Sequence, residues 1–439
     1  MVDPVASVWH LYGLSEDPFF QTELKALSDA SYPPSLFVGR ERELHLLARQ
    51  IAGSPSSRAL VQGSAGVGKT SFVNRLKADL AAQGVLSHEK PVRIVGEMSP
   101  RAFIAEVLKV LLRIRNSTVA GSSGKTRGAL KKAGETVSSD GRFWTRIARL
   151  VEGQDLVNAG VSIAALGGNI ERTRIPAEVE GLSLYDELEE AVTLLGKESQ
   201  ERSRSSRRIL IHVNNLEAMS TRDAQKAAAL LLDVRDYLMV SGAHWIFAGT
   251  TGVEATVFRV YDQVGGIFPP STTLAPLTGD EVGEMLELRY GHLQRGQQYQ
   301  PPVKIGDAVK LYRRYHGDLR NFLQLLSAAC NIELGVRDVR PLSPEMILNL
   351  MAPRFAAKIR AELGDTDYKH LLTMFKGGDG STELRVTDVA KRTRLHQTSA
   401  SQLVARLVRH GVLVPARTEA RNVYYRATGN TGIALGLAA

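Results

Sequence analysis

A glycine-rich loop between a strand and a helix is the feature that most constrains how this chain folds. Residues 63–71 read Gly63-Ser64-Ala65-Gly66-Val67-Gly68-Lys69-Thr70-Ser71. The run 58–62 before the loop predicts a short buried strand. After the loop, apolar residues recur at helical spacing, at Phe72, Val73, Leu76 and Leu80. Backbone N–H groups of the loop would therefore lie at the N-terminus of a helix, where anions bind.

Each residue type in this loop contributes to the binding of phosphate or Mg²⁺. The glycines allow the backbone to close around phosphate oxygens, which a Cβ would obstruct. Lys69 supplies positive charge to the β- and γ-phosphates, and the Thr70 hydroxyl is a ligand for Mg²⁺. Residues 63–71 are thus predicted to bind ATP together with Mg²⁺.

The charge of the chain favours a polyanionic partner. Its 439 residues carry a formal net charge of +9, an excess typical of proteins that bind nucleic acid or another anionic surface. The single cysteine, Cys330, excludes an internal disulfide and suits a reducing compartment. No apolar stretch of about 18 residues is present, so we expect no membrane partner and a cytoplasmic location.

Strand and helix patterns alternate around the loop, which is typical of a three-layer α/β nucleotide-binding domain. Besides 58–62, the predicted strands are 91–96, 209–213, 245–249 and 271–274. The expected division is an irregular segment over 1–35, the α/β core over 36–276 with an insertion at about 115–206, a helical lid over 277–358, and a winged helix over 359–439. Within the insertion, 161–170 suggests a hairpin, and the polar run 199–208 suggests a mobile loop.

Four further segments resemble motifs of the AAA+ ATPases, most closely the initiator branch of origin-recognition and replication-licensing proteins. A looser similarity is to bacterial transposition-regulator ATPases. Residues 37–44 resemble the segment that borders the adenine, which places Val38 at the nucleotide. Residues 248–251 occupy the sensor 1 position, which implies a role for Thr250, and 315–322 resemble sensor 2, whose arginine is Arg320 here. The resemblance covers about residues 36–430 without the insertion, and it implies a P-loop AAA+ core with a helical lid.

The fourth segment, strand 209–213, stands at the Walker B position and departs from the family pattern. An acidic pair is expected directly after this strand, but the chain has Asn214-Asn215, and the nearest carboxylate is Glu217. An amide can help hold Mg²⁺, as we expect of Asn214, but it takes up no proton near neutral pH. Asn215 and Glu217 are the candidate catalytic residues with Arg320. We expect secure ATP binding and weak or partner-dependent hydrolysis; whether the chain is an ATPase stays open. His212 is predicted to be a core residue.

The resemblance also implies self-assembly, in which an arginine of one subunit completes the site of its neighbour. Arg259 lies between two predicted strands, in a region suited to this role, although several other arginines compete for it. Lys69 and Arg320 would supply charge to the nucleotide from two different domains, so nucleotide state would become a conformational variable.

The C-terminal segment has the pattern of a winged helix with a basic surface. Over 383–426 there are nine basic and three acidic residues, a net +6. Short polar residues begin its third helix and suit groove contacts, while its arginines suit phosphates. The predicted contacts to double-stranded DNA are Gln397, Thr398, Ser399, Gln402, Arg406, Arg417 and Arg421. A protein-interaction module is the alternative. Basic residues of the insertion would add a second contact, or the insertion would be a solvated segment.

Two functions fit these features. In the first, the chain is an ATP-dependent initiator or loader that assembles on duplex DNA and recruits a protein effector such as a helicase, transposase or nuclease. In the second, it is a nucleotide-gated adaptor with little hydrolysis, in a mobile element or an antiphage defence system. The Asn214-Asn215 pair leans toward the second.

Overall fold

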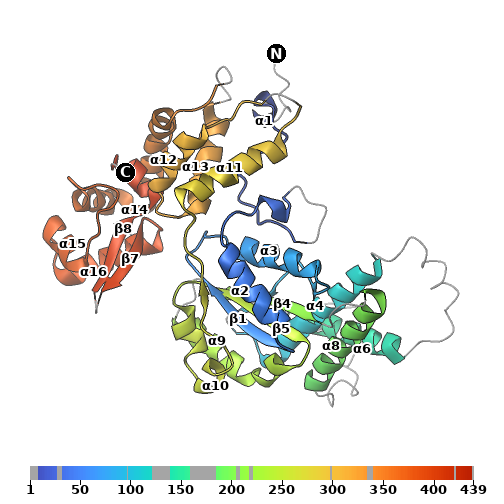
Figure 1. The fold of residues 1–439 in the computed structure, drawn as a ribbon. Coiled ribbons are helices and arrows are strands. Elements are labelled where there is room, and N and C mark those ends of the chain that lie inside the picture. The colour runs from blue at the N-terminus through green and yellow to red at the C-terminus, as the bar shows by residue number, and fades with distance from the viewer. Residues whose placement is uncertain are drawn as a thin grey trace, which may run out of the picture. The chain divides into compact units, whose positions relative to one another are not determined.

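The structure is a computed structural model that describes residues 8–26, 32–95, 97–120, 139–158, 184–203, 208–216, 221–296, 299–333, 340–419 and 422–437 (Figure 1). It divides into two compact units. We call residues 23–274 the core unit, and residues 1–22 with 275–439 the C-terminal unit.

The core unit combines a sheet with helices on both faces. Its described elements are η1 (Pro34–Leu36), α2 (Glu41–Ala52), β1 (Ser57–Gln62), α3 (Lys69–Ala81), β2 (Leu86–Ser87), β3 (Val92–Arg93), α4 (Pro100–Ala120), α6 (Ser139–Asn158), α8 (Leu184–Ser203), β4 (Ile209–Leu216), α9 (Thr221–Asp233), η2 (Asp236–Met239), β5 (Ala243–Gly249), η3 (Glu254–Phe258), α10 (Asp262–Gly265) and β6 (Thr272–Thr273).

Every pairing in this sheet is parallel. β5 lies between β4 and β1, β6 pairs with the other edge of β1, and both β2 and β3 pair with β4. The strand β1, which leads into the glycine-rich loop, is therefore flanked on both sides. Because the strands are parallel, their carboxyl ends meet at one edge of the sheet, where ligands of α/β proteins bind.

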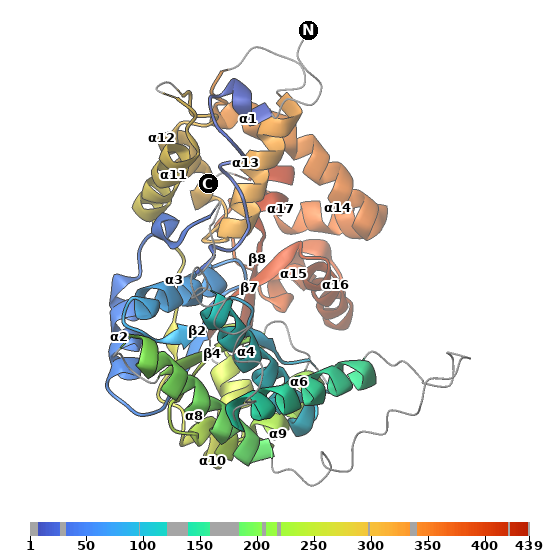
Figure 2. The same ribbon diagram turned by 90° about the vertical axis from the view of Figure 1, so that its right-hand side faces the viewer.

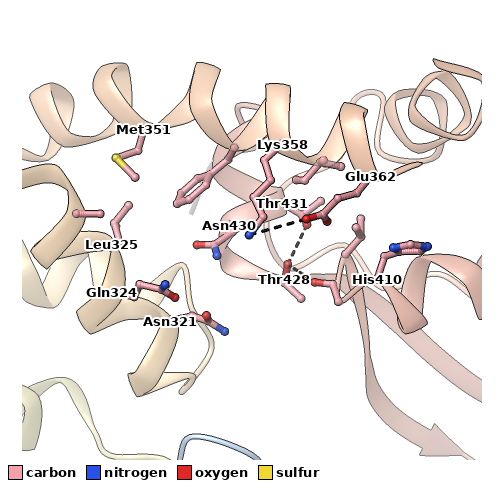
Figure 3. A pocket seen from close by; sticks show the side chains of 15 residues that line it. Asn321, Gln324, Leu325, Met351, Lys358, Glu362, His410, Thr428, Asn430 and Thr431 are labelled. Atoms are coloured by element: carbon pink, nitrogen blue, oxygen red, sulfur yellow. Dashed lines mark hydrogen bonds and ion pairs between the residues drawn. The ribbon is translucent and has the colours of Figure 1, made fainter. Parts of the chain in front are cut away.

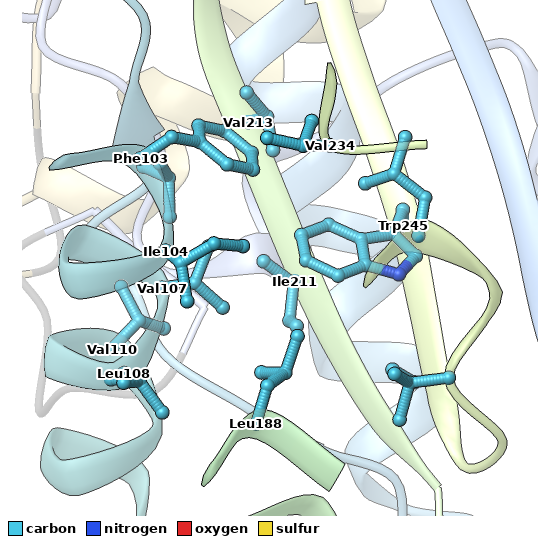
Figure 4. Packing of buried hydrophobic residues seen from close by; sticks show 14 of the residues in the cluster. Phe103, Ile104, Val107, Leu108, Val110, Leu188, Ile211, Val213, Val234 and Trp245 are labelled. Carbon is cyan, nitrogen blue, oxygen red and sulfur yellow. The ribbon is translucent and has the colours of Figure 1, made fainter. Parts of the chain in front are cut away.

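Alternation along the strands builds a core on each face of the sheet. Ile211, Val213 and Trp245 pack with α4 and neighbouring helices on one face (Figure 4). Leu210 and Ile246, the intervening residues, pack with α2 and α3 on the other. Successive side chains of a strand point to opposite faces, so continuous apolar runs in β4 and β5 require two covered faces. The α/β three-layer prediction is confirmed.

The insertion contributes ordered helices to the first of these cores. α6 and α8 both pack against α4 (Figures 1 and 2), with Phe143 and Ile147 from α6 and Leu188 from α8 fully buried. The predicted mobile loop over 199–208 is wrong in its first part, because α8 continues to Ser203. The hairpin predicted over 161–170 lies outside the described residues.

The N-terminal segment belongs to both units. In the C-terminal unit, the buried Arg289 donates to the carbonyl oxygens of Pro18 and Phe20 at 3.2 and 2.9 Å. In the core unit, the backbone N–H of Leu24 donates to Ser71 Oγ at 3.3 Å, and Asn74 Nδ2 donates to the Leu24 carbonyl at 2.8 Å. Pro18 and Phe20 thus contact helix α11 of the C-terminal unit. Leu24, a few residues later, contacts helix α3 of the core unit, which follows the glycine-rich loop.

The described residues of the C-terminal unit are helical apart from one hairpin and the connecting segments. Its described elements are α1 (Val8–Leu11), α11 (Gly279–Leu293), α12 (Ile305–Arg313), α13 (Leu319–Glu333), α14 (Pro344–Met374), α15 (Val386–Thr393), α16 (Gln397–Arg409), β7 (Leu413–Glu419), β8 (Asn422–Ala427) and α17 (Gly429–Ala434). α14 is interrupted at Gly364, which has φ 76° and ψ 165°, a conformation open to glycine. Cys330 is buried in α13, and burial raises the pKa of its thiol.

The last part of this unit has the arrangement of a winged helix. The end of α14, α15, α16 and the antiparallel pair β7–β8 share one apolar core that includes Leu371, Val389 and Leu403. β7 continues to Glu419, and β8 begins at Asn422. Leu372 is 45% exposed, whereas Leu371 and Met374 are buried in this core.

Candidate nucleotide site and nucleic-acid surface

The glycine-rich loop has the backbone shape that phosphate binding requires. Gly66 and Gly68 have φ of 78° and 95°, and α3 begins at Lys69, directly after Gly68. The left-handed backbone at these two glycines turns the loop so that it enters the helix at its positive end. Lys69 Nζ donates to the carbonyl oxygens of Gly63 and Ser64, each at 3.0 Å, which holds the ammonium group over the loop.

The neighbouring strands fix the start of this loop. Gly63 donates its N–H to the Gly249 carbonyl at 3.3 Å, and the N–H of Leu274 donates to the Gln62 carbonyl at 2.7 Å. A Cβ at position 63 would lie 3.0 Å from both the Leu274 carbonyl oxygen and a Val67 methyl group. The first glycine of the motif is therefore required for close packing as well as for access to phosphate.

Arg40 contacts the phosphate loop, a role that the sequence did not predict. The sequence motif places Arg40 only in the segment 37–44, which is expected to border the adenine. Arg40 precedes α2 in the left-handed region, with φ 67°, and its Nη2 donates to the Val67 carbonyl at 2.7 Å. Its Nη1 lies 3.4 Å from where a Cβ of Gly68 would stand. Val38, the predicted adenine neighbour, is buried two residues earlier. The segment 37–44 thus supports the loop directly.

The asparagine pair forms part of a strand, not the residues after one. β4 continues to Leu216, and its register with β5 shifts between Val213 and Leu216, at the asparagines. Asn215 has φ 75°, an arrangement that asparagine tolerates better than most residues. Its Nδ2 donates to the Ile94 carbonyl at 2.8 Å, and its N–H donates to Asn214 Oδ1 at 2.7 Å.

The hydrogen bonds of the pair tie β4 to the segment after β3, which lies on the side of β4 away from β5. Glu217, the carboxylate proposed to substitute, lies outside the described residues. Within the part of the chain that the structure describes, no group of three or more His, Cys, Asp or Glu side chains could hold a metal ion. The residues that suit Mg²⁺ here are Thr70, half-buried at the start of α3, and Asn214.

A buried lysine connects α3 to β4 beneath the site. Lys77 Nζ donates to the carbonyl oxygens of His88 and Glu89, at 2.7 and 3.2 Å, and lies 3.4 Å from His212 Nδ1. Burial lowers the pKa of Lys77 to about 7. Burial, and secondarily the Lys77 charge, holds the pKa of His212 well below its usual value. As predicted, His212 is a core residue, 2% exposed.

The remaining predicted nucleotide contacts lie in both units. Thr250 follows β5 directly and is half-buried, and its N–H donates to the Leu216 carbonyl at 3.3 Å. Arg320 is exposed in the first turn of α13. Asp318 caps the start of this helix, because its side chain accepts a hydrogen bond of 3.1 Å from the N–H of Asn321. Arg259, the candidate to complete a neighbour's site, is bound within its own chain by Glu254 at 3.0 Å and by the Gly265 carbonyl at 2.7 Å.

The first turn of α16 presents polar side chains to solvent. Gln397, Thr398, Ser399 and Gln402 are all exposed, on the face opposite the buried Leu403 and Leu407. This is the helix that a winged helix inserts into the major groove. The described structure is therefore compatible with the predicted groove contacts, which stay predictions.

The arginines predicted to bind phosphates are less available than their charge suggests. Arg406 forms a bidentate ion pair with Asp367, at 2.8 and 3.0 Å. Arg417 pairs with Glu383 and Glu419 at 2.7 and 2.6 Å, and Arg421 lies outside the described residues. Other exposed cations of this domain form no ion pair with another described residue, among them Lys391, Arg394 and Arg409.

A small cavity of about 160 Å³ lies between α13, α14 and the start of α17 (Figure 3). Asn321 and Gln324 of α13 face Thr428 and Asn430 across it, and Lys358 of α14 lies at its rim near Glu362. No predicted site residue lines this cavity.

Comparisons with known proteins find likeness only among solved structures. No family model and no curated protein matches the chain. The Aeropyrum pernix ORC1 protein in complex with DNA is 17% identical over 91% of this chain and 92% of that one, with a TM-score of 0.41. The A. pernix ORC2 protein in its ADPNP–ADP complexes is 15% identical over 96% of each chain, with a TM-score of 0.47. A chain of Drosophila ORC bound to DNA is 15% identical over 99% and 93%, with a TM-score of 0.42.

Identities and TM-scores this low leave the assignment of function to the chain's own residues. In the described residues, no helix combines the length and the apolar composition needed to cross a bilayer.

Proposed function

We propose that this chain binds ATP with Mg²⁺ and, depending on that nucleotide, assembles on duplex DNA and recruits a protein effector, as an initiator or loader does. The observation that carries the proposal is the loop at 63–70, where two left-handed glycines lead into α3 and Lys69 is held over the loop carbonyls. A loop of this shape directs N–H groups and a positive charge at one anion.

DNA binding is supported by the winged-helix arrangement on the same chain. Its α16 begins with exposed Gln397, Thr398 and Ser399, and Arg394 and Arg409 flank them without ion-pair partners among the described residues. Contacts of this kind divide into groove readers and phosphate binders, and the phosphate contacts give a steep dependence on salt.

In this proposal Lys69 and the loop amides bind the phosphates, and Thr70 and Asn214 help to hold Mg²⁺. The metal would supply charge stabilisation at the phosphates. Arg320 would respond to the γ-phosphate, and Arg259 would act on a neighbouring subunit after leaving Glu254.

A nucleotide-gated adaptor with little hydrolysis, as in mobile elements or antiphage systems, is the second candidate. It is favoured by the Asn214-Asn215 pair, whose polar groups bond to each other and to Ile94 and offer no base for the attacking water. ATP would then act by binding to the site, without being hydrolysed.

The test of the main proposal is duplex binding, followed by fluorescence anisotropy with and without the non-hydrolysable analogue ADPNP and Mg²⁺. We expect tighter DNA binding with ADPNP in the wild-type chain and no effect of ADPNP in Lys69→Ala. Sedimentation of the same samples measures assembly. Unchanged ADPNP affinity in Lys69→Ala would refute the nucleotide site.

Steady-state ATP turnover separates the two candidates. Strong DNA-stimulated turnover that is lost in Glu217→Ala and kept in Arg406→Ala excludes the adaptor. Turnover that stays near background with DNA, while ADPNP still tightens DNA binding, excludes the energy-using loader.

A further inference from the structure

The turn Arg314–Asp318, directly before α13, is bound by the winged-helix domain at three separate points. Tyr315 OH donates to Asn430 Oδ1 at 2.7 Å, and His316 Nε2 donates to the Gly380 carbonyl at 2.9 Å. Arg314 Nη1 donates to the Leu437 carbonyl at 2.6 Å. The three partners belong to different segments of that domain, so the turn is fixed to it in position and in orientation.

The Tyr315 ring packs so closely on Gly429 that a side chain at position 429 would clash with it. Its ring, 3% exposed as a residue, lies against Gly429, where an added Cβ would stand 2.4 to 2.7 Å from ring carbons. The same ring contacts Phe322 of α13 edge-on, with centroids 6.0 Å apart. Tyr315 is thus held between the helix that carries Arg320 and the first residue of α17.

The other side of the turn contacts the segment that leads from the core unit. Gly317 has φ 90°, and a Cβ there would lie 2.3 Å from Pro276. Two residues earlier in the chain, Leu274 bonds to Gln62 and packs against Gly63 at the start of the phosphate loop. Three consecutive residues, 274–276, therefore join the loop contact to the turn contact.

We propose that this turn is a coupling joint through which the nucleotide at the phosphate loop sets the DNA affinity of the winged helix. The inference rests on the proposed function and names its route: Gly63 to Leu274, along the chain to Pro276, across to Gly317, and through Tyr315 to Gly429. Tyr315 is a positioning residue in this route. Because Arg320 follows the turn directly, DNA bound to the winged helix also acts back on the nucleotide, as linkage requires.

A cavity lies beside the joint. The cavity of about 160 Å³ separates Gln324 of α13 from Thr428 and Thr431 (Figure 3). At Gly429, by contrast, an added methyl group would lie 2.4 to 2.7 Å from carbons of the Tyr315 ring.

Gly429→Ala tests the joint, and Gly432→Ala in the same helix is the matched control, because its Cβ meets no atom within 4 Å. Both variants replace glycine with alanine within the same short helix. For each chain we would measure the dissociation constant for a DNA duplex with and without ADPNP, and that for ADPNP with and without the duplex. The ratio of each pair is the coupling factor.

We expect a coupling factor of about tenfold or more in the wild-type chain and in Gly432→Ala. In Gly429→Ala it falls toward 1, while the affinity for either ligand alone stays within about threefold. Tyr315→Phe keeps the ring and removes only the hydrogen bond to Asn430, so we expect an intermediate coupling factor. If Gly429→Ala does not fold, Tyr315→Phe provides the test in its place.

Two results overturn the joint, and they are distinguishable. Undiminished coupling in Gly429→Ala, or in Tyr315→Phe where the first variant is unfolded, overturns the joint alone and leaves the proposed function standing. Equal DNA affinity with and without ADPNP in the wild-type chain overturns the proposed function and the joint together.

Discussion

Arg40 donates a hydrogen bond of 2.7 Å from its guanidinium group to the carbonyl oxygen of Val67, in the middle of the phosphate loop. The bond ties the segment before α2 to the loop and satisfies a carbonyl group of the loop backbone. It joins the segment 37–44 physically to the loop 63–71.

Loss of this bond should loosen the loop. Arg40→Ala is expected to weaken ADPNP binding by about tenfold or more, since hydrogen bonds from charged donors contribute about 1.5 to 3 kcal/mol. Isothermal titration with Mg²⁺ and ADPNP measures the effect. Arg42→Ala, which removes an exposed arginine two residues later, is the control and should bind normally. Equal affinities in the two variants would show that the Val67 contact does not shape the loop.

The buried amine of Lys77 should make stability depend on pH. With its pKa lowered to about 7, Lys77 is uncharged in the folded chain above that pH, whereas in the unfolded chain it stays protonated up to its usual value of 10.5. The folded state therefore binds fewer protons, and its stability rises with pH across this window and falls as pH drops toward 7.

Relative to Lys77→Met, the free energy of unfolding of the wild-type chain should rise by about 1.4 kcal/mol per pH unit between pH 7 and 10. Urea unfolding of both chains, followed by tryptophan fluorescence at several pH values, gives the difference. Lys90→Met is the control for loss of an exposed lysine. A pH-independent difference between the wild-type chain and Lys77→Met would contradict a buried, uncharged amine.

The two asparagines should respond differently to a carboxylate. Asn214 accepts a hydrogen bond through Oδ1, and a carboxylate oxygen at the same position would accept it too, so Asn214→Asp should fold normally and raise Mg²⁺-dependent ATP turnover. Asn215 donates through Nδ2 to Ile94, which a carboxylate cannot do; Asn215→Asp should lose about 1 to 3 kcal/mol of stability. Thermal unfolding and phosphate release measure the two effects. Equal destabilisation by both changes would be incompatible with these bonds.

Release of Arg406 from its ion pair should strengthen DNA binding. Asp367→Asn removes the acid that holds Arg406 and makes one more cation available to phosphate. We expect tighter duplex binding and a plot of log K against log salt that is steeper by about one unit. Asp307→Asn removes an acid from a comparable pair with Lys310 on α12 and is the control. The same gain in both variants would point to net charge rather than to Arg406.

The sequence was sufficient for the parts of the fold that local patterns specify. The loop 63–71, the buried runs of β4 and β5, and the amphipathic helices α15 and α16 follow from spacing and apolar periodicity. These features depend on residues that are close together in the chain, so they can be predicted from a single sequence.

Other parts depend on contacts between distant residues. Asp367 lies 39 residues before Arg406, so a count of charge over 383–426 overstates the free basic surface. The left-handed conformation of Arg40 has no signal in the residue itself. The helices of the insertion did carry a signal: Phe143, Ile147 and Leu150 recur at helical spacing, but the polar composition of the whole segment outweighed it.

The binding of Leu24 to α3 has a consequence for dividing this protein into pieces. Asn74, 3% exposed, donates an amide N–H to the Leu24 carbonyl, and Leu24 itself is 5% exposed. A fragment that starts at residue 36 would leave this buried amide without its acceptor and would lack the buried Leu24 side chain. We therefore expect that fragment to aggregate, and a fragment that starts at residue 23 to keep the helix of the phosphate loop intact.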